Sequence, residues 1–219
     1  MITVVGLGPS TCSYISVGAY GAIRTAPTVF VRTEHHPAVT ELAAEGIAFK
    51  SLDYIYESSG TFGEVYARIA ELILDEDERG DIVYAVPGHP LVGEEAVKIL
   101  IREARNKGRE IKIIGSESFI ESSLEALQLS MDAGLKVLDA LSMDRVAPAT
   151  DVGNLIYQVY DRDIASDVKL KLMELYPDEY DVDVIFGGAP PGEQVQRIPL
   201  YKLDRCDCDH LTSVYIPRL

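Results

Sequence analysis

Two turns that contain glycine and proline are the segments of this sequence best suited to bind a ligand. The first, Gly6-Leu7-Gly8-Pro9, follows the apolar run 2–5, and the second, Pro87-Gly88-His89-Pro90, follows a β-branched run that ends at Val86. Glycine lets the backbone turn tightly and lets a ligand approach it closely. Because ligands of open α/β sheets bind at the carboxyl ends of the strands, both turns are predicted to lie at a ligand-binding edge.

The first turn departs from the known phosphate-binding loops. The third glycine of a dinucleotide fingerprint would fall at Thr11, and Pro9 has no amide to donate to a phosphate. No Gly-Lys-Ser or Gly-Lys-Thr sequence follows, which excludes a P-loop. A plain strand-to-helix connection therefore remains an alternative for the first turn, and a rigid turn without a ligand remains one for the second.

Two further groups contain residues that could do chemistry. The cluster Cys206-Asp207-Cys208-Asp209-His210 offers metal ligands, but a C-x-C pair needs partners elsewhere to complete four ligands, so an exposed acidic loop is the simpler interpretation. The segment His35-His36-Pro37 could move a proton, although adjacent histidines at a helix start are typical of capping or surface residues. We therefore predict no metal site. Because the chain also has no G-x-S-x-G elbow for a nucleophilic serine, we leave the catalytic residues unassigned.

Composition narrows the possible partners and the compartment. The chain has 219 residues, with 20 Lys and Arg against 35 Asp and Glu, which gives a formal net charge of −15. Such a surface repels phosphate backbones and anionic lipids, so neither nucleic acid nor membrane is expected as a partner. The chain has no apolar run of about 20 residues and only three cysteines. An odd number of cysteines favours a reducing compartment, and we expect a cytoplasmic protein.

The first half of the chain alternates strands and helices. Strands are predicted at 2–5, 29–32, 49–52, 81–86 and 111–114. Helices are predicted between them at 15–23, at 36–45, from Thr61 onward and around 97–104; Thr61 and Glu64 fit a capping box. Strands joined by helices of this length imply right-handed crossovers and a mainly parallel sheet.

The second half has a different pattern. A helix at 118–129 and an irregular stretch lead to a strand at 155–159 and a helix that stops before Pro177. Strands at 182–186, 196–203 and 211–216 then follow without intervening helices, which requires antiparallel pairing and a mixed sheet. The change near Gly115 predicts an N-terminal α/β domain at 1–114 and a C-terminal α/β domain with a mixed sheet at 115–219.

Six segments, in this order and spacing, give the sequence a family resemblance: VVGLGPS, EHHPAV, YAVPGHPLVGE, GSESFIESS, QVYDRDIASDVKLKLME and IPLYKLDR…LTSVYIP. The chain resembles the tetrapyrrole (corrin/porphyrin) methylase family over essentially its whole length. It is most similar to the methylase-like N-terminal domain found fused to MazG-type nucleotide pyrophosphohydrolases.

The resemblance implies two dissimilar α/β domains, usually in a homodimer, with S-adenosyl-L-methionine bound in a cleft between the domains. It implies a methyltransferase that acts on a small-molecule acceptor. Carried over by position, the cofactor-binding residues would be Pro9, Pro87, Gly88, His89, Val92, Ser118, Phe119 and Gln158. Tyr14 and Tyr84, which lie near the two turns, could orient the acceptor.

The sequence departs from the family pattern in both turns. Where the family usually has G-D-P, this chain has Gly88-His89-Pro90, so an imidazole replaces a carboxylate; a neutral imidazole still accepts one hydrogen bond. Ser10 stands where the family usually has glycine. The arginines that could attract a carboxylate-rich acceptor, Arg24, Arg32, Arg145 and Arg162, are scattered in the sequence.

Two other functions remain open at this stage. The chain could be a non-catalytic ligand-binding or dimerisation module of a MazG-type nucleotide pyrophosphohydrolase, with a MazG-type domain after Leu219. It could also be a nucleotide-binding enzyme of another class, although Pro9 counts against a phosphate cradle.

Overall fold

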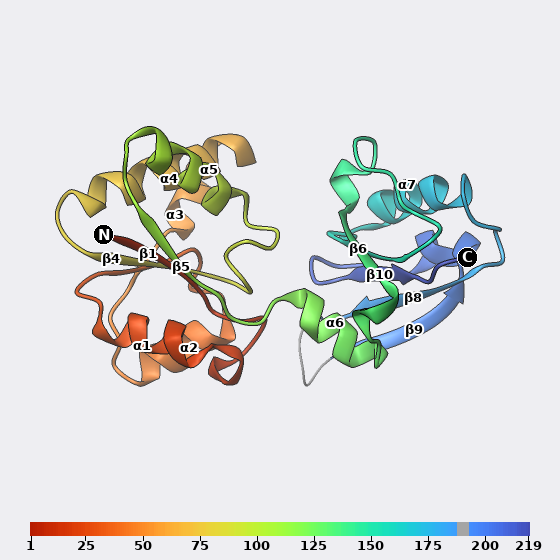
Figure 1. The fold of residues 1–219 in the computed structure, drawn as a ribbon, viewed down its shortest axis with the longest axis horizontal. Helices are drawn as coiled ribbons and strands as arrows, with labels where there is room; N and C mark the ends of the chain where they lie inside the picture. Colours follow the sequence, from red (N-terminus) through yellow and green to blue (C-terminus); the bar gives the residue numbers. More distant parts are fainter. Residues whose placement is uncertain (188–192) are drawn as a thin grey trace. The chain divides into compact units, whose positions relative to one another are not determined.

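The computed structural model describes residues 1–187 and 193–219. The chain divides into two compact units, Met1–Ser118 and Phe119–Leu219, which are described separately (Figure 1). The division falls at Ser118, whereas the change of sequence pattern suggests a boundary near Gly115.

The first unit is built on a parallel five-stranded sheet. Its strands are β1 (Ile2–Gly6), β2 (Val29–Val31), β3 (Lys50–Ser51), β4 (Ile82–Val86) and β5 (Ile111–Ile114). They are ordered β3-β2-β4-β1-β5, and each neighbouring pair is parallel. In this register Gly6 lies opposite Val86, so the two glycine- and proline-containing turns leave adjacent strands at the same level.

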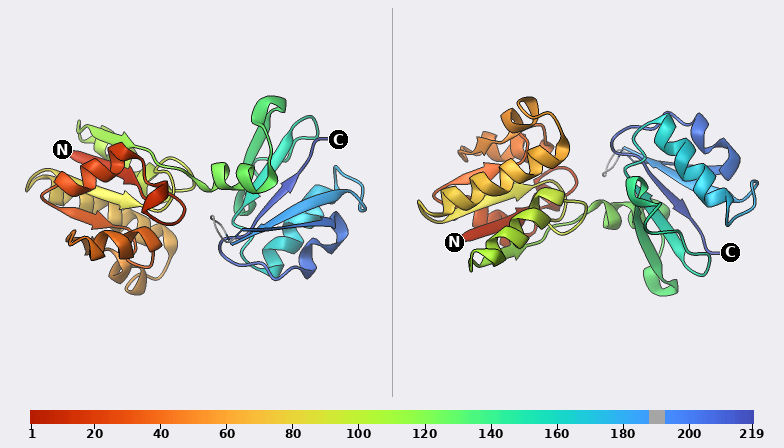
Figure 2. Two further views of the ribbon diagram at one scale, coloured as in Figure 1. Left: turned by 90° about the horizontal axis from the view of Figure 1, so that it is seen from below. Right: turned by 90° about the horizontal axis from the view of Figure 1, so that it is seen from above.

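Helices cover both faces of this sheet (Figures 1 and 2). One face carries α1 (Val17–Thr25) and α2 (Pro37–Ala44); the other carries α3 (Asp53–Glu57), α4 (Phe62–Asp77) and α5 (Glu95–Asn106). Successive strand residues point to opposite faces: Val4 packs in the core below α4 and α5, and Val5 in the core below α1 and α2. Burial on both faces explains the nearly continuous apolar strands.

The predicted cap of α4 is confirmed in part. The hydroxyl of Thr61 accepts a hydrogen bond from the Glu64 N–H at 3.3 Å. The Glu64 carboxylate reaches the N–H of Gly60 rather than that of Thr61. The Thr61 cap therefore forms without the reciprocal bond of a full capping box.

The second unit contains the mixed sheet that the sequence predicts. Its strands are β6 (Leu135–Asp139), β7 (Gly153–Tyr157), β8 (Asp181–Phe186), β9 (Gln194–Pro199) and β10 (Ser213–Ile216). They are ordered β6-β7-β10-β8-β9; β6 and β7 are parallel, and the other pairs are antiparallel. Helix α7 (Arg162–Met173) packs Val168 and Leu172 into the core of this sheet, and α6 (Phe119–Leu127) packs against β9.

Two elements of the second unit differ from the sequence-based prediction. Strand β6 lies in the stretch predicted to be irregular; it is an edge strand in which only Leu138 is fully buried, so its apolar pattern is weak. The strand predicted at 196–203 ends at Pro199, and a 3-10 helix (Leu200–Arg205) follows. Leu200 and Leu203 are both buried, and a spacing of three residues is that of a 3-10 turn rather than a strand.

No helix in residues 1–187 or 193–219 combines the length and the apolar character that a membrane span requires.

Candidate functional site

The two turns are joined to each other by backbone hydrogen bonds. The Leu7 N–H donates to the Val86 carbonyl at 2.8 Å. Beyond this, Gly8 and Gly88 form an antiparallel bridge, in which the Gly88 N–H donates to the Gly8 carbonyl at 2.7 Å and the Gly8 N–H donates to the Gly88 carbonyl at 3.2 Å. The turns after β1 and β4 therefore form one backbone unit at the carboxyl edge of the sheet.

Two glycines of the first turn are required by close backbone contacts. A Cβ at Gly6 would lie 2.4 Å from the Gly88 carbonyl oxygen, and a Cβ at Gly8 would lie 2.6 Å from the Tyr14 carbonyl oxygen. Gly8 also has a φ of +71°, which disfavours side chains. Gly88 differs: its φ is +62°, but the nearest atom to a Cβ there is the Ser118 Cα at 3.9 Å. The Cα face of Gly88 is thus open to a ligand.

The segment after β5 joins the same edge through a pair of serines. The Ser116 hydroxyl donates to the Gly6 carbonyl at 2.7 Å and accepts from the Ser16 N–H at 3.0 Å. The Ser16 hydroxyl donates to the Gly115 carbonyl at 2.6 Å and caps α1 by accepting from the Ala19 N–H at 3.2 Å. The sequence analysis missed both serines; Ser16 lies at the second position of the helix predicted at 15–23, and serine is a common cap at a helix start.

The imidazole of His89 is held by its own turn. Its Nδ1 accepts a hydrogen bond from the Leu91 N–H at 3.1 Å, so a neutral ring carries its proton on Nε2. A Cβ at Gly115 would lie 2.3 Å from His89 Nε2, which places the ring directly against the Gly115 backbone. The histidine that replaces the family's usual aspartate is therefore packed between the second turn and the segment after β5.

The structure brings six of the eight predicted cofactor-binding residues together. Pro9, Pro87, Gly88, His89 and Val92 are half-buried, and Ser118 is buried beside Gly88; all lie in the first unit, in or next to the two turns. Phe119 and Gln158 lie in the second unit. The ring of Phe119 packs on that of Tyr157, with the centroids 4.9 Å apart, and Gln158 is the next residue along the chain.

Gln158 has an unusual backbone conformation. It follows the last residue of β7 and has a φ of +63°, in the left-handed region. A non-glycine residue pays a conformational cost there, and residues held in this way occur often at functional sites. This observation supports a role for Gln158 and could not be read from the sequence.

The two tyrosines proposed to orient an acceptor have different environments. Tyr14 is half-buried beside Gly8. Tyr84 has no exposed surface and lies in the core beneath α4 and α5. Tyr84 is therefore a core residue, and its prediction as an acceptor-orienting group is wrong.

His36 and His35 also differ from each other. His36 is buried and accepts a hydrogen bond at Nδ1 from the Ala38 N–H at 3.3 Å, at the start of α2. Burial lowers the pKa of His36, and the nearby charge of Arg32 lowers it further. His35 is exposed. The interpretation of these histidines as capping and surface residues is confirmed.

The candidate metal ligands give no clear centre. Burial raises the pKa of Cys208 to about 11, and burial with nearby Asp207 also raises that of Cys206. Elsewhere in the described residues, ligand atoms of Glu34, His35 and Asp53 lie within 4.8 Å of one another. The first two are exposed, and we assign this trio no role.

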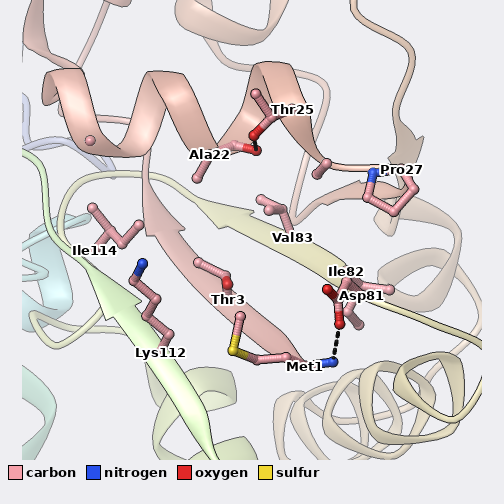
Figure 3. A pocket seen from close by; sticks show the side chains of 12 residues that line it. Met1, Thr3, Ala22, Thr25, Pro27, Asp81, Ile82, Val83, Lys112 and Ile114 are labelled. Carbon is pink, nitrogen blue, oxygen red and sulfur yellow. Dashed lines mark hydrogen bonds and ion pairs between the residues drawn. The ribbon is translucent and has the colours of Figure 1, made fainter.

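A cavity of about 320 Å³ lies at the opposite edge of the first sheet (Figure 3). It is lined by residues at the starts of β1 and β4, by Lys112 and Ile114 of β5, and by residues along α1 and just after it. The amino group of Met1 donates to the Asp81 carboxylate beside it at 2.6 Å. Because the two turns lie at the carboxyl edge, this cavity is separate from the candidate site.

Comparison with known proteins identifies the protein family of this chain. Residues 1–204 match the family described as Tetrapyrrole (Corrin/Porphyrin) Methylases, and the chain belongs to this family. The cofactor of the family is S-adenosylmethionine.

Particular relatives add detail. The chain is 38% identical over 219 residues to the uncharacterized protein YabN of Bacillus subtilis (strain 168), and it spans 99% of its own length but only 44% of that relative. A uroporphyrin-III C-methyltransferase from Thermus thermophilus in complex with S-adenosyl homocysteine has a similar fold, with a TM-score of 0.73 and 14% identity over 99% of this chain and 96% of the other. Diphthine synthase is also similar, with a TM-score of 0.70 and 17% identity over 99% and 89% of the two chains.

Proposed function

We propose that this protein is an S-adenosylmethionine-dependent methyltransferase and that the two joined turns of the first unit bind the cofactor. The observation that carries the proposal is the open face of Gly88, set between half-buried Pro87 and His89 on a backbone fixed by the Gly8–Gly88 bridge. A fixed turn with an open glycine lets a ligand hydrogen-bond to backbone groups at little entropic cost.

We further infer that Ser118, Phe119 and Gln158 take part in the cofactor site. Ser118 lies beside Gly88, and Phe119 is the next residue in the chain. The packed rings of Phe119 and Tyr157 offer an apolar surface suited to an adenine, and Gln158 beside them offers an amide that both donates and accepts.

The chemistry needs little from acidic or basic side chains. When bound, S-adenosylmethionine would supply a methyl group activated by its sulfonium, with S-adenosylhomocysteine as the leaving group. The protein's part is to bind and orient both reactants and to exclude water. Because the cofactor activates the methyl group and the protein only positions the reactants, no catalytic dyad is needed, and none is evident in the sequence.

The acceptor is proposed to be a small molecule without a dense cluster of carboxylates. Of the arginines considered, Arg24 lies over the ring of Tyr20 and Arg32 is paired with Glu94. Both are thus already engaged within the first unit, and the net charge of −15 repels polyanions.

Calorimetric titration with S-adenosylhomocysteine tests the proposal, because this product is stable in solution. We expect a micromolar Kd, about −8 kcal/mol. His89→Ala should weaken binding by about tenfold, since the ring fixes the second turn against Gly115. The matched control is His210→Ala, an exposed histidine in the second unit, which should bind as the wild type does. Absence of binding at millimolar ligand would contradict the proposal.

The alternative of a non-catalytic module of a MazG-type pyrophosphohydrolase gains no support from the comparisons. The homodimer and the cytoplasmic location stay predictions; that Cys12, Cys206 and Cys208 are all free agrees with a reducing compartment.

A further inference from the structure

Glu94 occupies the position between the second turn and α5, yet it does not cap the helix. In the part of the chain that the structure describes, its side chain makes no capping hydrogen bond. Serine, threonine, aspartate and asparagine are the usual residues here, because their short side chains reach the free amides of the first turn. The Glu94 side chain is instead 7% exposed and pairs with Arg32, with 2.5 Å between Oε1 and Nη1.

Arg32 contacts two residues that flank the second turn, Ala85 before it and Glu94 after it. Its backbone N–H donates to the Ala85 carbonyl at 2.9 Å, at the end of β4, and its guanidinium binds Glu94, at the start of α5. The segment between these two points, 86–93, contains four of the predicted cofactor-binding residues. One residue at the end of β2 therefore holds the strand before the turn and the helix after it.

Tyr56 fixes the orientation of the guanidinium. The Nε of Arg32 donates to the Tyr56 hydroxyl at 2.9 Å, from α3. The side chain of Arg32 is 29% exposed, so the ion pair lies mostly out of water. With Nε bonded to Tyr56 and Nη1 to Glu94, the guanidinium plane is defined by two contacts on different elements.

A gain in folding stability does not explain the Arg32–Glu94 ion pair well. The cost of desolvating two charges often equals or exceeds their attraction, and apolar side chains of similar volume commonly replace a buried ion pair without loss of stability. The Glu94 side chain also gives up a helix cap. The pair is costly, and it ties Glu94, at the start of α5, to Arg32, whose backbone is bonded to the end of β4. It is better explained by the spacing that it imposes on the two ends of the turn.

We propose that the Arg32–Glu94 ion pair is a positioning device that holds the 86–93 turn in the form that binds S-adenosylmethionine. The inference rests on the proposed function, and it adds a positioning role for Arg32, which lies outside the family segments quoted above, and for Glu94, the last residue of the YAVPGHPLVGE segment. Arg32 and Glu94 act through the turn and are positioning residues.

The test compares three variants by two readouts. Arg32→Met and Glu94→Leu in one chain remove the pair while keeping its volume, and Glu94→Gln removes one charge and keeps the shape. The readouts are the Kd for S-adenosylhomocysteine and the hydrogen-exchange rates of the backbone amides in 88–93, where Pro90 has none. The matched control replaces the Lys169–Asp204 pair of the second unit, whose side chains are 15% and 21% exposed, by Met and Leu.

We expect the Arg32→Met, Glu94→Leu chain to keep the wild-type melting temperature within a few degrees, about 4 °C. Its Kd should rise by about tenfold or more, and exchange at 88–93 should accelerate by a similar factor. Glu94→Gln should shift both readouts in the same direction. The Lys169–Asp204 control should change neither readout.

Each contrary result has a distinct meaning. The positioning role is overturned if exchange at 88–93 in the double variant is as slow as in the wild type. If the double variant does not fold, the same result in Glu94→Gln overturns it. Wild-type affinity in a folded variant with faster exchange overturns the link to the cofactor. If the wild type itself binds no S-adenosylhomocysteine, the proposed function fails, and exchange at 88–93 still decides whether the pair holds the turn.

Discussion

The two units of this protein shape the ends of their strands by different means. In the first unit the turns after β1 and β4 are fixed by backbone: Gly6 and Gly8 admit no side chain, and Gly8 bridges to Gly88. In the second unit the end of β7 is shaped by side chains, with Phe119 packed on Tyr157 and Gln158 held in a left-handed conformation. The first unit thus offers a ligand a preset backbone, whereas the second offers side chains that substitution can change without rebuilding the chain.

A similar difference holds for the interior. The loop before β7 is organised by the side chain of Asn154, which has no exposed surface. Its Oδ1 accepts from the Ala149 N–H at 2.9 Å, and its Nδ2 donates to the Ala149 carbonyl at 2.7 Å. The hydroxyl of Tyr176 donates to the same carbonyl at 2.9 Å. In the second unit a buried side-chain amide thus fixes a loop, whereas in the first unit backbone hydrogen bonds fix the turns.

The largest expected effect comes from adding a side chain at Gly6, where the backbone of the first turn lies against that of the second. Gly6→Ala places a Cβ 2.4 Å from the Gly88 carbonyl oxygen, and neither backbone can yield easily. We expect a loss of about 3 kcal/mol in the free energy of unfolding, measured by urea denaturation. Gly63→Ala is the control: it lies exposed in α4 with nothing within 4 Å, and it should gain up to about 1 kcal/mol. Equal effects at the two glycines would contradict the account.

The second largest effect is expected from removing the Asn154 side chain, which organises the loop before β7 in the second unit. Asn154→Ala leaves the N–H and carbonyl of Ala149 without this partner, which should cost about 2 kcal/mol. Hydrogen exchange should accelerate around 149–157 and not in the strands of the first unit. Asn106→Ala, at the end of α5, should stay within about 0.5 kcal/mol of the wild type. Faster exchange spread evenly over both units would show that the comparison is mistaken.

A smaller effect is expected at Gln158. Glycine adopts a φ of +63° without strain, so Gln158→Gly should be more stable than Gln158→Ala by about 1 kcal/mol. Thermal unfolding of the two variants measures the difference. Because both variants lack the amide, both should bind S-adenosylhomocysteine more weakly than the wild type. Unchanged affinity would mean that the conformation serves the fold alone.

The smallest effect concerns pH. Burial lowers the pKa of His36 in the folded state, whereas the unfolded chain has a value of about 6.5. The unfolded state therefore binds more protons as the pH falls through about 6.5, and the folded state loses stability in that window until its own lower pKa is reached. His36→Asn keeps a helix-capping side chain and should reduce the stability difference between pH 7.5 and 5.5 by about 0.5–1 kcal/mol.

The sequence predicts much of the fold because the buried strands are strongly patterned. Five apolar runs separated by amphipathic helices indicate the parallel sheet, and the turns at Gly8 and Gly88 follow from it. Strand β6 was not predictable, because an edge strand with one fully buried residue has little apolar signal. The 3-10 helix at 200–205 was not predicted, because Leu200 and Leu203 were included in the strand predicted at 196–203.

The site was predictable only where its residues stand in a contiguous motif. Pro87, Gly88 and His89 belong to one turn, whereas Arg32 and Glu94 are 62 positions apart in a chain with 55 charged residues. Their pairing depends on β2 lying next to β4, which tertiary structure alone establishes. The left-handed conformation of Gln158 likewise has no sequence signature, since glutamine rarely adopts it.

Hydrogen exchange with and without saturating S-adenosylhomocysteine tests the central claim most directly. The account predicts protection of the amides of the non-proline residues in 6–10, 86–93 and 115–118 of the first unit and at 119 and 157–158 of the second. Amides at 25–28 and 81–83, beside the cavity at the opposite edge of the sheet, should not change. Protection confined to that opposite edge, or no protection anywhere, would contradict the assignment of the two turns as the cofactor site.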